Sequence, residues 1–295
     1  MSDGRVVKGN AEAPLDEHAV EVGGLRTRYL AAGAGLPVVL LHATEETALD
    51  WQWVLPALAR ANRVYAPDLP GSGGTAAPPA AYTPEFFQGF VSAFLDRLDI
   101  ERAVLVGNSL GGLAALRLAL AAPERVAALV LVASGGLGQA ISPAFLPLIW
   151  PGSGEIAMAW SRTPLGALQR AWTRAALLFT RPWRAPAAWL IEQQRVAQLP
   201  GFLEAQLAAL RAQIGPWGQR EVLLDQLPGL DMPVLIVWGD ADRVVPLSQA
   251  RAAIGRLRKG SLALIPDAGH LPHIEQPGSF LASVLPFLAA QSAGQ

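Results

Sequence analysis

The chain alternates between short apolar runs and longer segments with helical periodicity, first over residues 20–137 and again from about residue 230. Short apolar runs are typical of strands that are buried on both faces, and their alternation with helices predicts a mostly parallel, doubly wound α/β sheet. An alternating segment around a Gly-Gly pair predicts a β-hairpin at the start. The predicted strands occupy this hairpin (20–30) and residues 37–42, 63–66, 103–106, 126–133, 234–238 and 261–265, and the predicted helices occupy 51–60, 84–98, 110–121, 247–258 and 277–290.

The alternation stops between residues 138 and 225, in a proline-punctuated stretch rich in Ala and Leu that holds six of the nine tryptophans. It predicts several helices and no strand. A helical insertion after the sixth predicted strand favours a cap over the carboxyl edge of the sheet, where such sheets bind ligands. We expect most of these tryptophans to pack the cap against the core, and one or two to line a pocket. The predicted units are a flexible tail (1–18), a core (19–137 and 226–295) and the cap (138–225).

Composition narrows the class of protein. With 52% apolar and 16% charged residues among 295, the chain can bury a large core. A net charge of −1 gives no reason to expect a nucleic-acid partner, and the lack of cysteine excludes disulfides, thiolate metal sites and cysteine nucleophiles. The N-terminus is polar and no apolar run exceeds strand length, so we expect no secretory signal, no membrane span and a cytoplasmic location. The oligomeric state stays open, with a homodimer among the options.

The sequence Gly107-Asn108-Ser109-Leu110-Gly111 lies between a predicted strand and a predicted helix. A serine on so sharp a turn has a strained backbone, and its hydroxyl projects from the carboxyl edge of the sheet. Larger side chains at the two glycine positions would collide across the turn. The pattern predicts Ser109 as a nucleophile and the amide of Leu110, at the start of the helix, as a donor to an oxyanion.

A serine nucleophile needs a base, and an imidazole base needs a carboxylate to fix its tautomer. We expect His270, in a loop after the last predicted strand, to be the base, and His273 to be structural. The segment after strand 234–238 offers Asp242 and Asp240 as the carboxylate, and Asp267 is a remote third candidate.

The chain order Ser…Asp…His resembles that of the α/β-hydrolase superfamily over residues 20–137 and 230–290. The family patterns G-x-x-D-x-x-x-P and G-H-x-P-x-x-E-x-P match Gly239 to Pro246 and Gly269 to Pro277. The resemblance implies an α/β-hydrolase sheet, a triad of Ser109, Asp242 and His270, and no need for a metal or cofactor. It also implies that Asp240 caps a turn and that Asp68, in Asp-Leu-Pro-Gly, is a hydrogen-bonding turn residue rather than a catalyst.

The loop after strand 37–42 departs from the family, which usually has His-Gly where this chain has His42-Ala43. Glycine accepts positive φ angles that alanine disfavours, so the loop is expected to be rearranged. The second oxyanion donor of the family corresponds to Thr44, with Ala43 as the alternative.

Glu45 and Glu46 follow in the same loop. We favour the interpretation that both are solvated and cap a helix near Asp50, although they could also reach the mouth of the site. The substrate pocket itself is expected to include Asn108, His42 and Leu271.

The favoured function is a serine hydrolase that cleaves an apolar small-molecule carboxylic ester. The alternative is a carbon–carbon bond hydrolase of the meta-cleavage-product type, acting on a ketone. The elbow of that group often reads Gly-Asn-Ser-Met-Gly-Gly, close to residues 107–112, but it usually has tryptophan where this chain has Leu271. A third hypothesis is a receptor or accessory protein that keeps the hydrolase fold. The predicted cap contains eight arginines that could bind a carboxylate, so a carboxylate-bearing substrate, as the carbon–carbon bond hydrolases need, also stays open. They are Arg162, Arg170, Arg174, Arg181, Arg184, Arg195, Arg211 and Arg220.

Overall fold

The computed structural model describes residues 6–7 and 15–292. Its main feature is a nine-stranded sheet in the order β1-β2-β3-β5-β4-β6-β7-β10-β11. The pairs among β1, β2, β3 and β5 are antiparallel, and all later pairs are parallel. The strands are β1 (Val6–Val7), β2 (Leu15–Val22), β3 (Leu25–Ala32), β4 (Leu36–Leu41), β5 (Asn62–Pro67), β6 (Ala103–Asn108), β7 (Val126–Val132), β10 (Val234–Gly239) and β11 (Gly260–Ile265).

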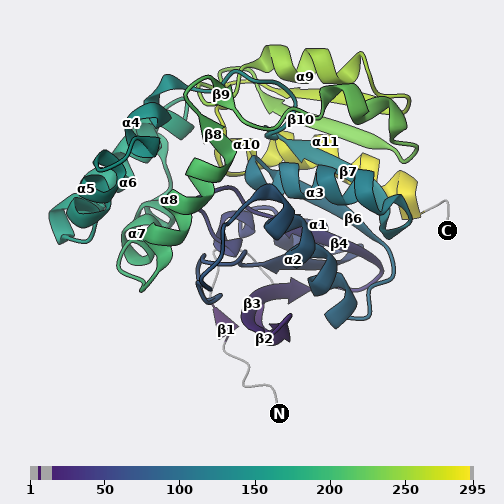
Figure 1. The fold of residues 1–295 in the computed structure, drawn as a ribbon. Coiled ribbons are helices and arrows are strands. Elements are labelled where there is room, and N and C mark those ends of the chain that lie inside the picture. Colours follow the sequence, from purple (N-terminus) through teal and green to yellow (C-terminus); the bar gives the residue numbers. More distant parts are fainter. Residues whose placement is uncertain (1–5, 8–14, 293–295) are drawn as a thin grey trace.

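Helices cover both faces of this sheet (Figure 1). One face packs against α2 (Pro84–Arg97), α3 (Leu110–Ala121) and α9 (Leu247–Ile254), and the other packs against α1 (Leu55–Leu58) and α11 (Pro277–Ser292). Alternation along each strand supplies the two cores: in β4, Val39 and Leu41 face α2 and α3, while Val38 and Leu40 face α1 and α11. The predicted mostly parallel, doubly wound α/β fold is thus confirmed.

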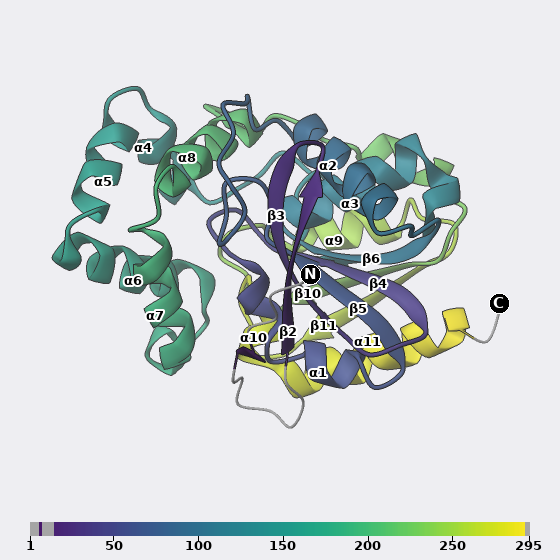
Figure 2. The ribbon, with the colours of Figure 1, turned by 90° about the horizontal axis from the view of Figure 1, so that it is seen from below.

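A group of helices between β7 and β10 lies at the carboxyl edge of the strands, beyond one end of the sheet (Figure 2). These helices are α4 (Leu146–Ile149), α5 (Ser153–Ser161), α6 (Pro164–Leu178), α7 (Ala187–Val196) and α8 (Phe202–Gln213). We call residues 138–225 the cap. A short hairpin of β8 (Ile214–Gly215) and β9 (Gly218–Gln219) follows α8, so the expectation of a strand-free cap was wrong. Two-residue strands leave no hydrophobic periodicity that the sequence could reveal.

Two further expectations need correction. The strand β2 begins at Leu15, inside the predicted tail, and Val6–Val7 pair with it. The residues just after Leu15 are polar and at least partly exposed, so they show no hydrophobic pattern that would predict a strand. The rest of the predicted tail lies outside the described residues. The predicted helix 51–60 is a 3-10 turn (Ala48–Trp51) followed by the single turn of α1. Pro56 lies in the first turn of α1, where it is tolerated, but its missing N–H prevents one continuous helix from running through this position.

The cap tryptophans do not pack mainly against the core. Trp189 is buried, whereas the other five are between 44% and 86% exposed: Trp150, Trp160, Trp172, Trp183 and Trp217. In α6, Ala167, Ala171 and Ala175 are buried, whereas the larger Leu165, Leu168 and Trp172 are exposed. Hydrophobicity alone therefore does not indicate which side of this helix turns inward. Within the described residues, no helix is both long and apolar enough to cross a bilayer.

Candidate active site

Ser109 stands between β6 and α3, at the carboxyl edge of the sheet. Its backbone has φ 52° and ψ −110°, a conformation that L-residues rarely adopt. A Cβ on Gly107 would lie 2.3 Å from the carbonyl oxygen of Gly111, and one on Gly111 would lie 2.3 Å from that of Leu41. The predicted strained turn with obligatory glycines is therefore present, and it directs Ser109 into a pocket.

His270 follows β11 and lines the same pocket as Ser109. Its Nδ1 lies 2.9 Å from Oδ2 of Asp242, which follows β10, and both side chains are almost fully buried. The other oxygen of Asp242 accepts hydrogen bonds from the amides of Val244 (2.8 Å) and Val245 (3.1 Å). These amides fix the carboxylate, which in turn orients the imidazole.

The alternative site residues lie elsewhere. Asp240 is exposed, and Asp267 is exposed and paired with Arg181 at 3.2 Å. His273 is buried and stacks on Trp51 with 4.2 Å between ring centroids. Burial, with a small contribution from His270, lowers the pKa of His273 to about 3, so it is a neutral packing residue.

Asn108 does not line the pocket, in contrast to the prediction. It is buried, and its Nδ2 donates to the carbonyls of Val132 (3.0 Å) and His270 (3.1 Å). Glu275 holds the same loop from the other side, with Oε1 accepting from the amide of Gly269 at 2.6 Å and Oε2 from that of Thr180 at 2.8 Å. Sequence reasoning matched Glu275 to a motif but gave it no role.

His42 is also buried and absent from the pocket lining, so it is corrected from a pocket residue to a support of the loop that follows it. Burial lowers its pKa despite Asp68 nearby, and the ring is therefore neutral. Its Nε2 accepts from the amide of Leu69 (2.9 Å), which leaves Nδ1–H to donate to the carbonyl of Ala43 (2.8 Å). Leu271, in contrast, does line the pocket.

Residues 43–46 form a tight turn that we call the oxyanion loop. The amide of Glu46 donates to the carbonyl of Ala43 at 3.2 Å. The positive φ of this turn, 64°, falls on Glu45 and not on Ala43. Alanine therefore fits its position without strain, and the strained backbone of the turn lies at Glu45. Ala43 and Thr44 line the pocket, while Leu110, whose amide begins α3, is buried beside it.

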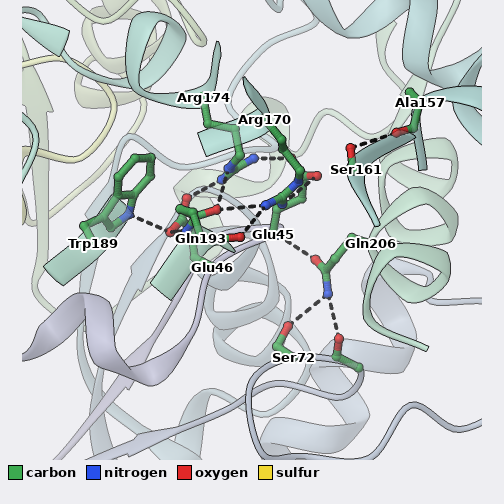
Figure 3. Close-up of polar contacts among 11 residues, drawn as sticks. Glu45, Glu46, Ser72, Ala157, Ser161, Arg170, Arg174, Trp189, Gln193 and Gln206 are labelled. Atoms are coloured by element: carbon green, nitrogen blue, oxygen red, sulfur yellow. Dashed lines mark hydrogen bonds and ion pairs between the residues drawn. The ribbon is translucent and has the colours of Figure 1, made fainter. Parts of the chain in front are cut away.

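Glu45 and Glu46 are neither solvated nor capping groups, so the favoured interpretation was wrong. Both are ion-paired to arginines of the cap helix α6: Arg174 contacts both carboxylates, and Arg170 contacts Glu45 at 3.1 Å (Figure 3). The Nε1 of Trp189 also donates to Glu46, at 3.0 Å. Thr47, and not either glutamate, caps the 3-10 turn that follows.

Electrostatics explain why this cluster tolerates burial. Burial raises the pKa of Glu45, but Arg174 and Arg170 outweigh it and hold that pKa below its ordinary value, so Glu45 is charged. Asp50, next to the cluster, behaves in the opposite way: burial and the neighbouring Glu46 raise its pKa well above the usual range. The charged form of Asp50 is therefore disfavoured beside Glu46.

The pocket around Ser109 and His270 has a volume of about 50 Å³ and opens between the core and the cap. No tryptophan occurs among its described lining residues, which corrects the expected tryptophan-lined pocket. Its apolar wall comes from Leu113, Ile141, Phe145, Leu178, Leu210, Ile214, Val244, Val245 and Leu271. The described residues contain no cluster of three or more side chains suited to hold a metal ion.

Comparison with known proteins gives a consistent family. Residues 37–277 match the family model described as alpha/beta hydrolase fold. The chain is 34% identical to the dihydrolipoyllysine-residue acetyltransferase component of the acetoin cleaving system of Pseudomonas putida, over 94% of this chain and 70% of that protein. It is 30% identical to a 2-hydroxy-6-oxo-6-(2'-aminophenyl)hexa-2,4-dienoic acid hydrolase of Metapseudomonas resinovorans, over 97% of this chain and 95% of that protein.

Among solved structures, a serine hydrolase involved in carbazole degradation (the CarC enzyme) superposes with a TM-score of 0.78 at 28% identity. The match covers 94% of this chain and 99% of that chain. The similarity therefore includes the cap as well as the sheet.

Proposed function

Because this chain belongs to the alpha/beta hydrolase fold family, we propose that it is a serine hydrolase that cleaves an apolar small-molecule carboxylic ester through an acyl-enzyme. The observation that carries the proposal is the hydrogen bond between Asp242 and His270, in a pocket that His270 shares with Ser109. The proposal is supported by the positions of the three residues after β6, β10 and β11, because the parallel strands of the sheet bring those ends to one edge.

In the proposed reaction, Oγ of Ser109 attacks the carbonyl carbon of the ester, while Nε2 of His270 takes the hydroxyl proton. Asp242 accepts the Nδ1–H of the imidazole and stabilises the imidazolium. His270 then returns the proton to the leaving alkoxide as the C–O bond breaks. Water, deprotonated by the same imidazole, then attacks the carbonyl carbon of the acyl-enzyme. As the bond between that carbon and Oγ breaks, His270 returns the proton to Oγ, which releases the carboxylic acid and restores Ser109.

The negative oxygen of each tetrahedral intermediate needs donors that are already in place. We assign this role to the amide of Leu110, which the helix dipole of α3 assists, and to the amide of Thr44, with that of Ala43 as the alternative. The bonds from His42 and the ion pairs of Glu45 hold the second donor's loop rigid.

The carbon–carbon bond hydrolase is the second candidate, supported by 30% identity to a dienoic acid hydrolase and to a 2-hydroxymuconate semialdehyde hydrolase. Its substrates are dienoic acids and carry a carboxylate. Arg174 is the only Arg or Lys among the described residues of the pocket lining, and it is already paired with Glu45 and Glu46. Glu221 adds a third carboxylate to the lining. This charge pattern favours a neutral ester over an acid.

The deciding experiment compares wild type with Ser109→Ala. A fluorophosphonate should label wild type once and leave Ser109→Ala unlabelled, and nitrophenyl esters should lose turnover by about 10⁴–10⁶-fold in the variant. A panel of simple esters and vinylogous diketone acids separates the two candidates. A higher kcat/KM for the diketone acids than for every simple ester would favour the second candidate over the ester proposal. Turnover of neither, with an apolar ligand raising Tm, would favour a receptor or accessory protein.

A further inference from the structure

A second cavity, of about 220 Å³, lies inside the cap and is larger than the pocket at Ser109. It is bordered by α4, α5, α6 and α8 and is partly open to the surface, and we call it the cap cavity. Its walls are mainly apolar, formed by Leu148, Ala157, Met158, Trp160, Leu203, Leu207 and Leu210. A cavity of this size and lining suits a hydrocarbon group.

The cap cavity adjoins the pocket at Ser109. Glu45, Arg174 and Leu210 line both, so the same three side chains face the two spaces. Moving Glu45 or Arg174 would break a buried ion pair, whereas Leu210 makes no polar bond with its side chain. Leu210 is therefore the side chain that can yield at lowest cost and join the two cavities.

The charged groups of the cap cavity and the hydroxyl of Ser161 already have partners, which defines the ligand further. Arg170 bonds Glu45 and also donates to the carbonyl (3.2 Å) and the side-chain oxygen (3.2 Å) of Gln193. Ser161 donates to the carbonyl of Ala157 at 2.7 Å (Figure 3). A charged or strongly polar group would have to displace these bonds, and an alkyl chain would not.

We propose that the cap cavity is the distal subsite of the enzyme and takes the hydrocarbon tail of the substrate, which passes Leu210 from the ester bound at Ser109. This inference rests on the proposed ester hydrolase function and adds to it the class of substrate. The substrate is an ester with an extended, uncharged alkyl tail, because the 50 Å³ pocket at Ser109 is too small to hold such a tail alone.

The test fills the cap cavity from α5. Ala157→Leu places a larger side chain in the cavity, and Ala159→Leu, on the exposed side of the same helix, is the matched control. We compare kcat/KM for nitrophenyl decanoate with that for nitrophenyl acetate. The ratio should fall at least tenfold in Ala157→Leu and stay at the wild-type value in Ala159→Leu. A parallel series of acetate esters of ethanol and decanol shows whether the tail belongs to the acyl or the alcohol part.

A second variant changes the ratio in the opposite direction. Leu210→Ala widens the passage and should raise the decanoate-to-acetate ratio at least threefold, with thermal unfolding measured to confirm that the variant folds. Equal ratios in Ala157→Leu and Ala159→Leu for both ester series would overturn the distal subsite. That outcome differs from failure of the proposed function, in which wild type hydrolyses none of these esters and takes up no fluorophosphonate.

Discussion

The two sides of the candidate site are held in place by different means. On one side, the core positions Ser109, Asp242 and His270 through backbone geometry: a strained turn, two amides on a carboxylate and a short loop after β11. On the other side, the oxyanion loop is held by side chains of the cap, chiefly Arg170 and Arg174. Local backbone geometry therefore fixes the positions of the residues on the first side. Ion pairs between residues about 125 positions apart in the sequence fix the loop on the second side.

The largest effect should come from the core side. Asp242→Asn leaves the shape of the site intact but removes the charge that stabilises the imidazolium, so kcat should fall by about 10⁴-fold. Asp240→Asn, on an exposed residue two positions away, is the control and should retain wild-type kcat. Steady-state kinetics on one nitrophenyl ester measure both. Equal activity of the two variants would show that the carboxylate has been assigned to the wrong residue.

The cap side should respond most strongly in stability. Arg174→Met leaves the carboxylates of Glu45 and Glu46 buried without their shared cation, which should lower the free energy of unfolding by about 3–5 kcal/mol. Arg162→Met breaks the exposed pair with Glu204 and should cost about 0–1 kcal/mol. Urea unfolding of both variants gives the two values. A cost for Arg174→Met no larger than that for Arg162→Met would show that the cluster does not hold the loop.

A smaller effect on the cap side is the pH dependence of the stability that the ion pairs of Glu45 provide. Because the arginines hold the pKa of Glu45 below its ordinary value, the folded state binds fewer protons there than the unfolded state. Its contribution to stability is present above the ordinary glutamate pKa and is lost as the pH falls through the folded pKa. Glu45→Gln should therefore lower Tm at pH 7 and flatten the decline of Tm below about pH 4.5.

The exposed Glu124→Gln is the control for this pH dependence and should follow the wild-type curve. If Glu45→Gln and Glu124→Gln give parallel curves from pH 3 to pH 7, the ion pairs of Glu45 contribute no net stability.

The smallest expected effect is that of Ala43→Gly, which tests whether the oxyanion loop suits its own sequence. Since the positive φ lies at Glu45, glycine at position 43 relieves no strain and only adds flexibility. The kcat should fall about two- to fivefold, which corresponds to about 0.5–1 kcal/mol. A rise of tenfold or more would mean that the native loop is poorly placed for ester hydrolysis.

The same contrast explains which features the sequence could predict. Sheet strands, the glycine-flanked turn and the placement of Asp242 and His270 follow from local patterns of a few residues, and the structure brings these residues together. The structural roles of His42 and Asn108 were missed because burial, which the sequence does not report directly, decides whether such a side chain faces a pocket. Glu45 and Glu46 resemble ordinary surface glutamates, and only their distant partners on α6 identify them as buried ions.

The ion pairs across the boundary also limit how this protein could change over evolutionary time or in the laboratory. A cap inserted between two strands is in principle an exchangeable module, and replacing it would be a direct route to new specificity. Here the core contributes two buried glutamates that depend on α6 of its own cap. A transplanted cap would have to bring its own arginines, or the recipient core would first have to lose both carboxylates. Cap and core are therefore expected to be inherited as a matched pair.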